Sequence, residues 1–166
     1  MLHGVGFVTG DPTIRIGYPF IMHPGVQVSS TEVGDNKWIY MMLPIPKWSL
    51  ITQVAIAYKK TGIHNYLSLI RLVEQREPVS ATVVHNEIIE KTIPSSCIIS
   101  AACHVVVRKS ILLKVCMEFN NEEDLIEFGS VEVRYIPEYE SSVPEEVKDR
   151  REKNFLQMLS SEKQLS

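Results

Sequence analysis

Residues 111–119 have the sequence ILLKVCMEF, and this stretch decides the fold. Its odd-numbered positions are all apolar, whereas its even-numbered positions include Lys114 and Glu118 beside Leu112 and Cys116. Successive side chains of a β-strand point to opposite faces, so this alternation predicts a strand with one buried and one solvated face. Half-buried strands of this kind are typical of antiparallel sheets that pack against a second layer.

Similar patterns extend on both sides of this strand. Residues 50–59 place Val54, Ile56 and Tyr58 on one face, and residues 125–136 form another alternating stretch, in which Gly129 predicts a bulge. Further strands are predicted over residues 13–16, 18–22, 26–29, 37–43, 66–73, 81–84, 87–89, 97–99 and 104–107. Polar turns or loops are expected at residues 34–36, 61–62, 74–78 and 120–124.

Many short strands separated by frequent turns predict a mostly β fold. The expected architecture is a two-sheet antiparallel β-sandwich of jelly-roll-like type, followed by a C-terminal α-helix. Residues 1–137 are expected to form the sandwich domain, and residues 138–166 a charged helix or tail. Strand order is not encoded locally, so other two-sheet topologies stay open.

The predicted C-terminal helix carries few apolar residues among many charges. Ser142, Pro144 and Glu145 resemble a helix N-terminus with its cap and its early proline. Phe155, Met158 and Leu159 form a narrow apolar stripe, which we interpret as an oligomerisation helix. Packing of the same stripe on its own domain is an equal alternative.

Composition narrows the classes of partner. The 166 residues carry 17 basic and 20 acidic side chains, a formal charge of −3, and no basic run precedes residue 147. Binding to nucleic acid draws on a basic patch, so no nucleic-acid partner is expected. The first ten residues lack the features of a signal peptide, and no window of about 18 apolar residues occurs, so a soluble cytoplasmic protein without membrane contact is predicted.

The three cysteines are Cys97, Cys103 and Cys116. An odd number without a C-x-x-C pair argues against a secreted disulfide framework and favours small buried side chains in strands. A single bridge, from Cys103 to either of the other two, stays open at this point because pairing depends on geometry.

Aromatic residues are the strongest candidates for a binding site. Trp38, Tyr40 and Trp48 bracket the segment 44–46, whose two prolines favour an extended path at a sheet edge. Exposed rings at an edge can stack on the apolar faces of sugars or bind peptides, so these three residues are candidate ligand-binding residues. The alternative is ordinary packing of tryptophan in the core or at its rim.

Metal-binding and catalytic motifs are absent. His85 and Glu87 share one face of a predicted strand and could supply two metal ligands, but no third ligand accompanies them, and a solvated strand edge is the alternative. Gly-rich phosphate loops, nucleophile elbows and zinc-finger spacings do not occur. We therefore assign no catalytic residue and expect no cofactor.

A family resemblance adds to this interpretation. Residues 43–46, 51–58, 69–72 and 131–135, together with Trp38, resemble the strands of small bacterial β-sandwich modules of jelly-roll type. The resemblance covers about residues 37–136. It is to carbohydrate-binding domains and to phage tail or receptor-binding pieces, and it implies a carbohydrate or protein ligand, or a place in a virus or phage particle.

Taken together, these features predict a non-enzymatic β-sandwich that acts in assembly or in ligand binding and forms a homo-oligomer. Carbohydrate is the first candidate ligand. The alternatives are a viral or phage structural protein, and an enzyme whose jelly-roll pocket gathers dispersed histidines and glutamates, among them His23, His64, His85 and His104.

Overall fold

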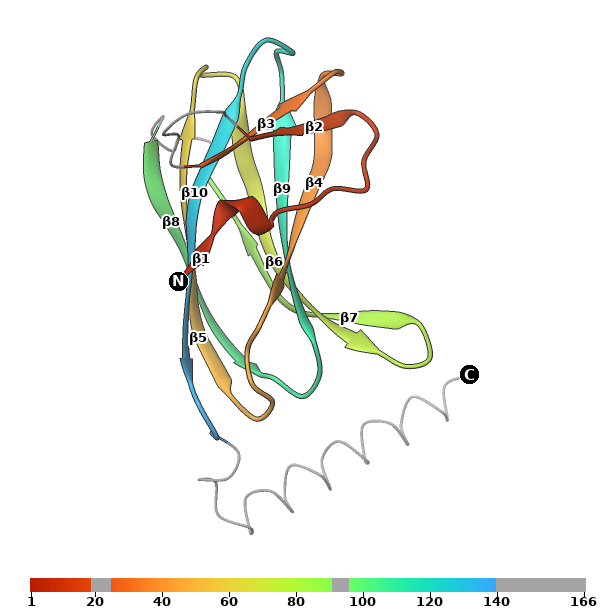
Figure 1. Cartoon of the computed structure of the whole chain (residues 1–166), viewed down its shortest axis with the longest axis vertical. Helices are drawn as coiled ribbons and strands as arrows, with labels where there is room; N and C mark the ends of the chain where they lie inside the picture. The colour runs from red at the N-terminus through yellow and green to blue at the C-terminus, as the bar shows by residue number, and fades with distance from the viewer. Residues whose placement is uncertain (19–24, 91–95, 140–166) are drawn as a thin grey trace.

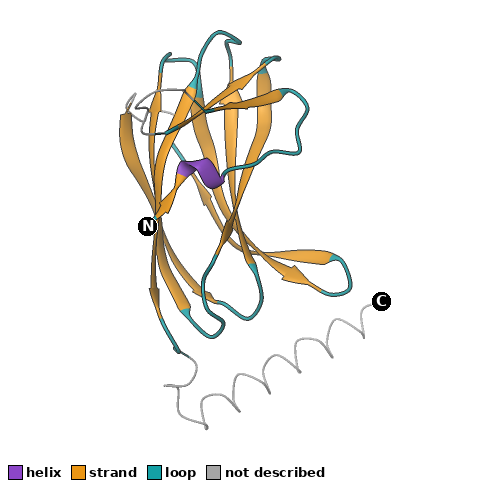
Figure 2. Cartoon of the chain, viewed as in Figure 1, coloured by secondary structure: helices purple, strands orange, loops and turns teal. Residues whose placement is uncertain are grey.

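The computed structural model describes residues 1–18, 25–90 and 96–139, and of residues 96 and 97 only the backbone. These residues form two antiparallel sheets that face each other (Figures 1 and 2). Sheet A contains β1 (Leu2–His3), β2 (Ile14–Gly17), β3 (Val26–Ser30), β5 (Leu50–Lys60), β8 (Ser96–Val106) and β10 (Ile126–Ile136). Sheet B contains β4 (Gly34–Leu43), β6 (Tyr66–Arg76), β7 (Ser80–Ile88) and β9 (Ile111–Phe119). A short 3₁₀ helix, η1 (Gly4–Gly6), follows β1.

The strand pairings are nested one inside another. β3 pairs with β10, β4 with β9, β5 with β8, and β6 with β7. The chain from β3 to β10 therefore resembles one long hairpin, with its tip between β6 and β7, that has been rolled into two layers. Pairing of β10 with β5 and of β9 with β6 joins the rolled parts within each sheet. This is the strand order of a jelly roll, and the predicted two-sheet antiparallel sandwich is confirmed.

The core lies between the sheets and is filled by the inward positions of each strand. The odd-numbered side chains of β9 are all buried, as the alternation of residues 111–119 predicts. In β5 the predicted inward residues Val54, Ile56 and Tyr58 are buried as well. Phe7, which follows η1, is fully buried with its ring centroid 5.2 Å from that of Phe128 in β10. Burying a side chain of this size contributes about 1.5–3 kcal/mol, so the N-terminal segment is part of the core.

Two predicted loops overlap with strands of the structure. Residues 34–36, expected to form a turn, begin β4, where Gly34 and Asn36 have φ angles of 143° and 58° and the register with β9 shifts. These residues keep turn-like dihedrals inside a paired strand. The loop predicted at residues 74–78 is also wrong at its start, because β6 continues to Arg76. Glu74 is buried there and its carboxylate is hydrogen-bonded, which a polar segment in isolation does not reveal.

The weak predicted strands merge into longer ones. The strands predicted at residues 81–84 and 87–89 fall on β7 except for residue 89, and those predicted at 97–99 and 104–107 fall on β8 except for residue 107. Pairing along a full-length neighbour supplies hydrogen bonds through the positions that lack an apolar pattern. β7 is also an outlying strand, and most of it is exposed. Its hairpin with β6 extends away from the body of the sandwich (Figure 1).

The predicted bulge at Gly129 is confirmed, since the register between β10 and β5 shifts between Phe128 and Val131. The bulge lies against η1. A Cβ atom on Gly4 would lie 2.5 Å from the carbonyl oxygen of Phe128 and 2.7 Å from that of Gly129. Only glycine therefore fits at position 4 without moving the backbone of β10.

Some of the predicted elements lie outside the residues that the structure describes. Residues 140–166, with the predicted stripe of Phe155, Met158 and Leu159, lie outside the described residues, as does most of the strand predicted at 18–22.

Cys103 and Cys116 are free thiols, so neither disulfide left open above forms. No helix in the described ranges is long and apolar enough to span a membrane.

Candidate functional site

The candidate site is the outer face of sheet B, the face that points away from the core. Register aligns its side chains in three rows that cross β4, β9, β6 and β7 in that order. The first row consists of Trp38, Cys116, Leu69 and Ile88. The second row, which holds both cations of this face, consists of Tyr40, Lys114, Arg71 and Asn86. The apolar row consists of Met42, Leu112, Val73 and Val83.

These rows follow from the alternation of each strand. In β4 the odd residues Ile39 and Met41 are buried in the core, so Trp38, Tyr40 and Met42 point outward. β4 is an edge strand of sheet B, as expected for a strand followed by Pro44 and Pro46. Its outer edge is paired at one point, where the backbones of Val8 and Tyr40 exchange two hydrogen bonds of 2.9 and 2.8 Å. The two aromatic side chains therefore stand on a strand whose position is fixed from both sides.

Two cations lie against these aromatic rings. The Arg71 guanidinium carbon is 5.1 Å from the centroid of the Trp38 ring, and Lys114 Nζ is 4.9 Å from the same centroid. Lys114 Nζ also lies 5.0 Å from the centroid of the Tyr40 ring. Cations within about 6 Å of an aromatic face are attracted by its negative potential, by about 0.5–1 kcal/mol at exposed sites. Trp38, Tyr40, Arg71 and Lys114 thus form one cluster, which we call the aromatic–cation cluster.

The two cations of this cluster are not neutralised by acids of the described residues. Arg71 and Lys114 are direct cross-strand partners, an arrangement that disfavours like charges. Arg71 Nε donates a 2.7 Å hydrogen bond to the neutral Oδ1 of Asn86. No ion pair to either cation occurs within residues 1–18, 25–90 and 96–139. Burial lowers the pKa of Lys114, and the positive charge of Arg71 lowers it further.

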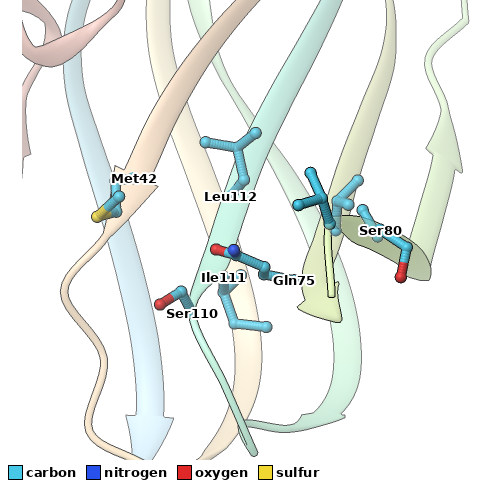
Figure 3. A pocket seen from close by; sticks show the side chains of 9 residues that line it. Met42, Gln75, Ser80, Ser110, Ile111 and Leu112 are labelled. Atoms are coloured by element: carbon cyan, nitrogen blue, oxygen red, sulfur yellow. The ribbon is translucent and has the colours of Figure 1, made fainter. Parts of the chain in front are cut away.

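A groove adjoins the cluster at the apolar row. It has a volume of about 430 Å³, and its lining includes Val73, Ile111 and Leu112. Met42 borders it from β4, while Gln75, Val79, Ser80, Ala81 and Ser110 complete the wall. Figure 3 shows how Met42, Leu112 and Ser80 reach it from different strands. A mostly apolar lining with a few hydroxyl and amide groups is the common composition of ligand sites.

Glu74 holds one wall of the groove in place. Its Oε1 accepts hydrogen bonds from the backbone N–H groups of Arg108 and Lys109, at 2.9 and 3.1 Å. The backbone N–H of Gln75 donates to the carbonyl oxygen of Ser110 at 3.1 Å. The loop between β8 and β9 is thereby tied to β6, and this fixes Ser110 and Ile111 at the groove.

The structure brings together two of the three predicted aromatic residues. Trp38 and Tyr40 are half-buried on the outer face of sheet B, next to the same lysine. Trp48 is 48% exposed and lies in the loop between β4 and β5, where its backbone N–H donates to the carbonyl oxygen of Val107. That loop lies at one end of the sandwich (Figure 1), and Trp48 is not part of the three rows.

The two candidate metal ligands lie on β7. His85 and Glu87 pair with Leu72 and Ile70 of β6, so they share one face as predicted. His85 Nε2 is buried without a hydrogen-bond partner, whereas Glu87 is exposed. Within the described residues no group of three histidine, cysteine, aspartate or glutamate side chains is placed to hold a metal ion.

The enzyme alternative requires histidines or carboxylates that converge on a pocket. His64 belongs to the loop before β6, His85 to β7 and His104 to β8, and His23 lies outside the described residues. None of them is among the groove residues named above. A second depression, of about 450 Å³, lies beside His3 and Gly129 on the outer side of sheet A, and its lining contains no tryptophan or tyrosine.

Sequence analysis missed Arg71 and Lys114. Each is a basic residue inside a strong strand pattern, and on its own each looks like an ordinary solvated position. What distinguishes them is that β6 and β9 are neighbours in register, so that both charges face the rings of β4. A basic residue on the outward face of two strands was the available signal, but the pairing of those strands was needed to interpret it.

Comparisons with known proteins give little beyond the fold. The sequence matches no family model and no curated protein. Among solved structures, the chain resembles that of the N-terminal CBM22-1–GH10 modules of endo-1,4-β-D-xylanase 10B from Clostridium thermocellum, complexed with xylohexaose. The TM-score is 0.49 and the identity 11%, over 80% of this chain and 26% of that one, so this chain spans about a quarter of its length. A likeness of this degree does not extend to ligands or to individual residues.

Proposed function

We propose that the chain is a carbohydrate-binding β-sandwich and that it binds its ligand on the outer face of sheet B. The observation that carries this proposal is the pair of half-exposed rings, Trp38 and Tyr40, on adjacent outward positions of one strand beside an apolar groove. Aromatic rings in the core need no such explanation, but rings kept at the surface next to a groove offer contact area at little entropic cost.

Sugar chemistry suits both parts of this face. A pyranose ring has apolar C–H patches, which pack on aromatic and aliphatic side chains, and a rim of hydroxyl groups that need hydrogen-bond partners. The groove offers Met42 and Leu112 for the first purpose, and Gln75, Ser80 and Ser110 for the second. The guanidinium and ammonium groups of the aromatic–cation cluster are further donors.

The experiment is a titration of the full chain with a panel of oligosaccharides, followed by calorimetry and by tryptophan fluorescence. Trp38→Ala and Tyr40→Ala are expected to weaken binding tenfold or more, a loss of about 1.4 kcal/mol or greater. Trp48→Ala is the matched control, because Trp48 is exposed but lies off this face. If Trp38→Ala binds every ligand as tightly as the wild type, or if Trp48→Ala alone abolishes binding, the proposed face is wrong.

Self-association is a second candidate function, favoured by the open edges of the two sheets. In the described residues β7 pairs only with β6, and β8 only with β5. Ile88 of β7 is 78% exposed and Ile98 of β8 is 71% exposed. Unpaired edges with exposed apolar side chains are templates for pairing with a second chain. We propose that a homo-oligomer or a larger particle would assemble through pairing of these strand edges.

Light scattering of the full chain over a wide concentration range tests this candidate. A defined oligomer that Ile88→Lys or Ile98→Lys converts to a monomer supports assembly through an edge. A full-length variant with serine in place of Phe155, Met158 and Leu159 tests the predicted oligomerisation segment in the same assay. A monomer at every concentration contradicts both routes.

A further inference from the structure

The aromatic–cation cluster contains two cations that are register partners. Among the exposed cations of the described surface, Arg15 and Lys47 also lack an acidic partner, but neither is a register partner of a second cation. Two others have acidic partners: Arg134 Nε lies 2.8 Å from Glu132, and Lys109 Nζ lies 3.0 Å from Glu77. Arg71 and Lys114 have none within the described residues, although they stand directly opposite each other on the two central strands of sheet B.

This arrangement is unfavourable in the free protein. Like charges on directly opposite residues of an antiparallel pair destabilise the sheet, and Lys114 is partly desolvated as well. The rings of Trp38 and Tyr40 offset some of the cost by attracting both cations. A bound anion would remove the rest, because it supplies the missing negative charge at the point where the two cations meet.

We infer that the carbohydrate bound by this face is acidic, and that a sugar carboxylate of a uronic acid lies between Arg71 and Lys114. The inference rests on the function proposed above. A neutral sugar would leave the two cations uncompensated, and it would have to compete with them for the ring of Trp38, on which both already lie. An acidic sugar instead draws the cations toward itself.

The orientation of Arg71 fits this role. Its Nε is occupied by Oδ1 of Asn86, and no hydrogen bond from its two terminal nitrogens to a described residue occurs. Those two nitrogens can donate in parallel to the two oxygens of one carboxylate. Asn86 is then a positioning residue, which fixes the plane of the guanidinium group without touching the sugar.

The groove lies next to Arg71 and Lys114, along the direction of the strands. Met42 lies two residues after Tyr40 along β4, and Leu112 lies two residues before Lys114 along β9, in each case a step of about 6.8 Å. A sugar whose carboxylate meets the two cations can therefore place its neighbour in the chain over the apolar row. We expect an oligosaccharide, rather than a single sugar, to be needed for full affinity.

The test compares an oligogalacturonate with its methyl ester, in which a methyl group removes the charge of each carboxyl group, on the full chain by calorimetry. The acid is expected to bind at least tenfold more tightly than the ester, and its affinity should fall as salt concentration rises. Arg71→Gln and Lys114→Gln should lower affinity for the acid to that for the ester. Lys59→Gln, which removes an exposed cation on sheet A, away from the three rows, should change neither.

Other outcomes separate this inference from the proposed function. If acid and ester bind equally and Trp38→Ala weakens both, the face binds carbohydrate but the acidic ligand is wrong. If neither these sugars, nor alginate and glucuronate oligomers, nor neutral oligosaccharides bind, both proposals fail. If a sulfated oligosaccharide or a short DNA binds as tightly as the acid, the cluster recognises anions in general, and the assignment of a carboxylate is overturned.

Discussion

Removing the buried acceptor at Glu74 tests how the loop between β8 and β9 is held against sheet B. The residue is 3% exposed, and its Oε1 accepts two of the backbone hydrogen bonds that tie down this loop, from Arg108 and Lys109. Its Oε2 lies 3.8 Å from Arg76, whose side chain is 46% exposed. Oε1 therefore binds the backbone of the loop and Oε2 contacts Arg76, and substitutions can distinguish the two contributions.

The expected magnitudes follow from this division. Glu74→Met keeps an unbranched chain of similar length but removes the acceptor, so two hydrogen bonds to a charged group are lost at about 1.5 kcal/mol each, or about 3 kcal/mol together. Glu74→Gln retains an amide oxygen for the two N–H groups and loses only the partly exposed contact with Arg76, for which about 1 kcal/mol or less is expected. Glu77→Gln, at an 85% exposed side chain, is a control that should cost no more than about 0.5 kcal/mol.

Urea unfolding measures the free energy of unfolding of each variant. In thermal unfolding, the Tm of Glu74→Met should be roughly 6–12 °C below that of the wild type for a chain of this size. The variant should also bind less well at the groove, because Ser110 and Ile111 lose their fixed position. The explanation fails if Glu74→Met unfolds within about 0.5 kcal/mol of the wild type. It fails equally if Glu74→Gln is as destabilised as Glu74→Met, since the two N–H groups would then not be the cause.

Three further predictions use other parts of the sandwich. Gly4→Ala should destabilise the protein by about 1–3 kcal/mol in urea unfolding, since its Cβ would collide with two carbonyl oxygens of β10, whereas Gly10→Ala, with nothing within 4 Å, should be close to neutral. The hydrogen bond from the Thr13 hydroxyl lowers the pKa of Asp11, so Asp11→Asn should be less stable than the wild type above the ordinary value of 3.8, and the gap should close as pH falls through the lowered pKa; a gap that does not change with pH excludes this linkage. Burial raises the pKa of Cys103 to about 11, so Cys103 of the folded protein should react slowly with iodoacetamide at pH 8 and faster only as pH approaches that value, and rapid labelling of Cys103 at pH 8, located by mass spectrometry of peptides, contradicts it.

The strands could be predicted from the sequence wherever one face is buried and the other is not. The alternation of residues 111–119 matches β9 from end to end, and residues 50–59 match β5 within one residue. The alternation of apolar and polar residues did not predict a strand where a buried polar residue has its hydrogen-bond partners in a distant segment. Glu74 was assigned to a loop because its partners, the N–H groups of residues 108 and 109, lie more than thirty positions away.

The order of the strands could not be predicted, because the pairings that define the roll are between distant segments. β3 and β10 are separated by most of the chain, and no local pattern states that residues 26–28 pair with residues 126–128. The candidate site depends on the same information. Trp38 and Tyr40 could be singled out as aromatic residues of an edge strand, but Trp48, only ten positions away, lies in a connecting loop outside the face.

The two outer faces of the sandwich differ in a way that favours sheet B as the functional one. On sheet A the outward positions of β5 include Ala55 and Ala57, and the neighbouring charges of Glu132 and Arg134 neutralise each other. These features cost little and offer little to a ligand.

Sheet B instead keeps features that folding alone does not favour. Met42 is 70% exposed beside a groove, and Arg71 and Lys114 face each other without a described acidic partner. Replacing either cation with a neutral residue would relieve a repulsion of a few tenths of a kcal/mol to about 1 kcal/mol. Natural proteins retain such local costs mainly where function requires them. The unfavourable charge pair is therefore itself an argument that this face binds a ligand, and that the ligand supplies the missing negative charge.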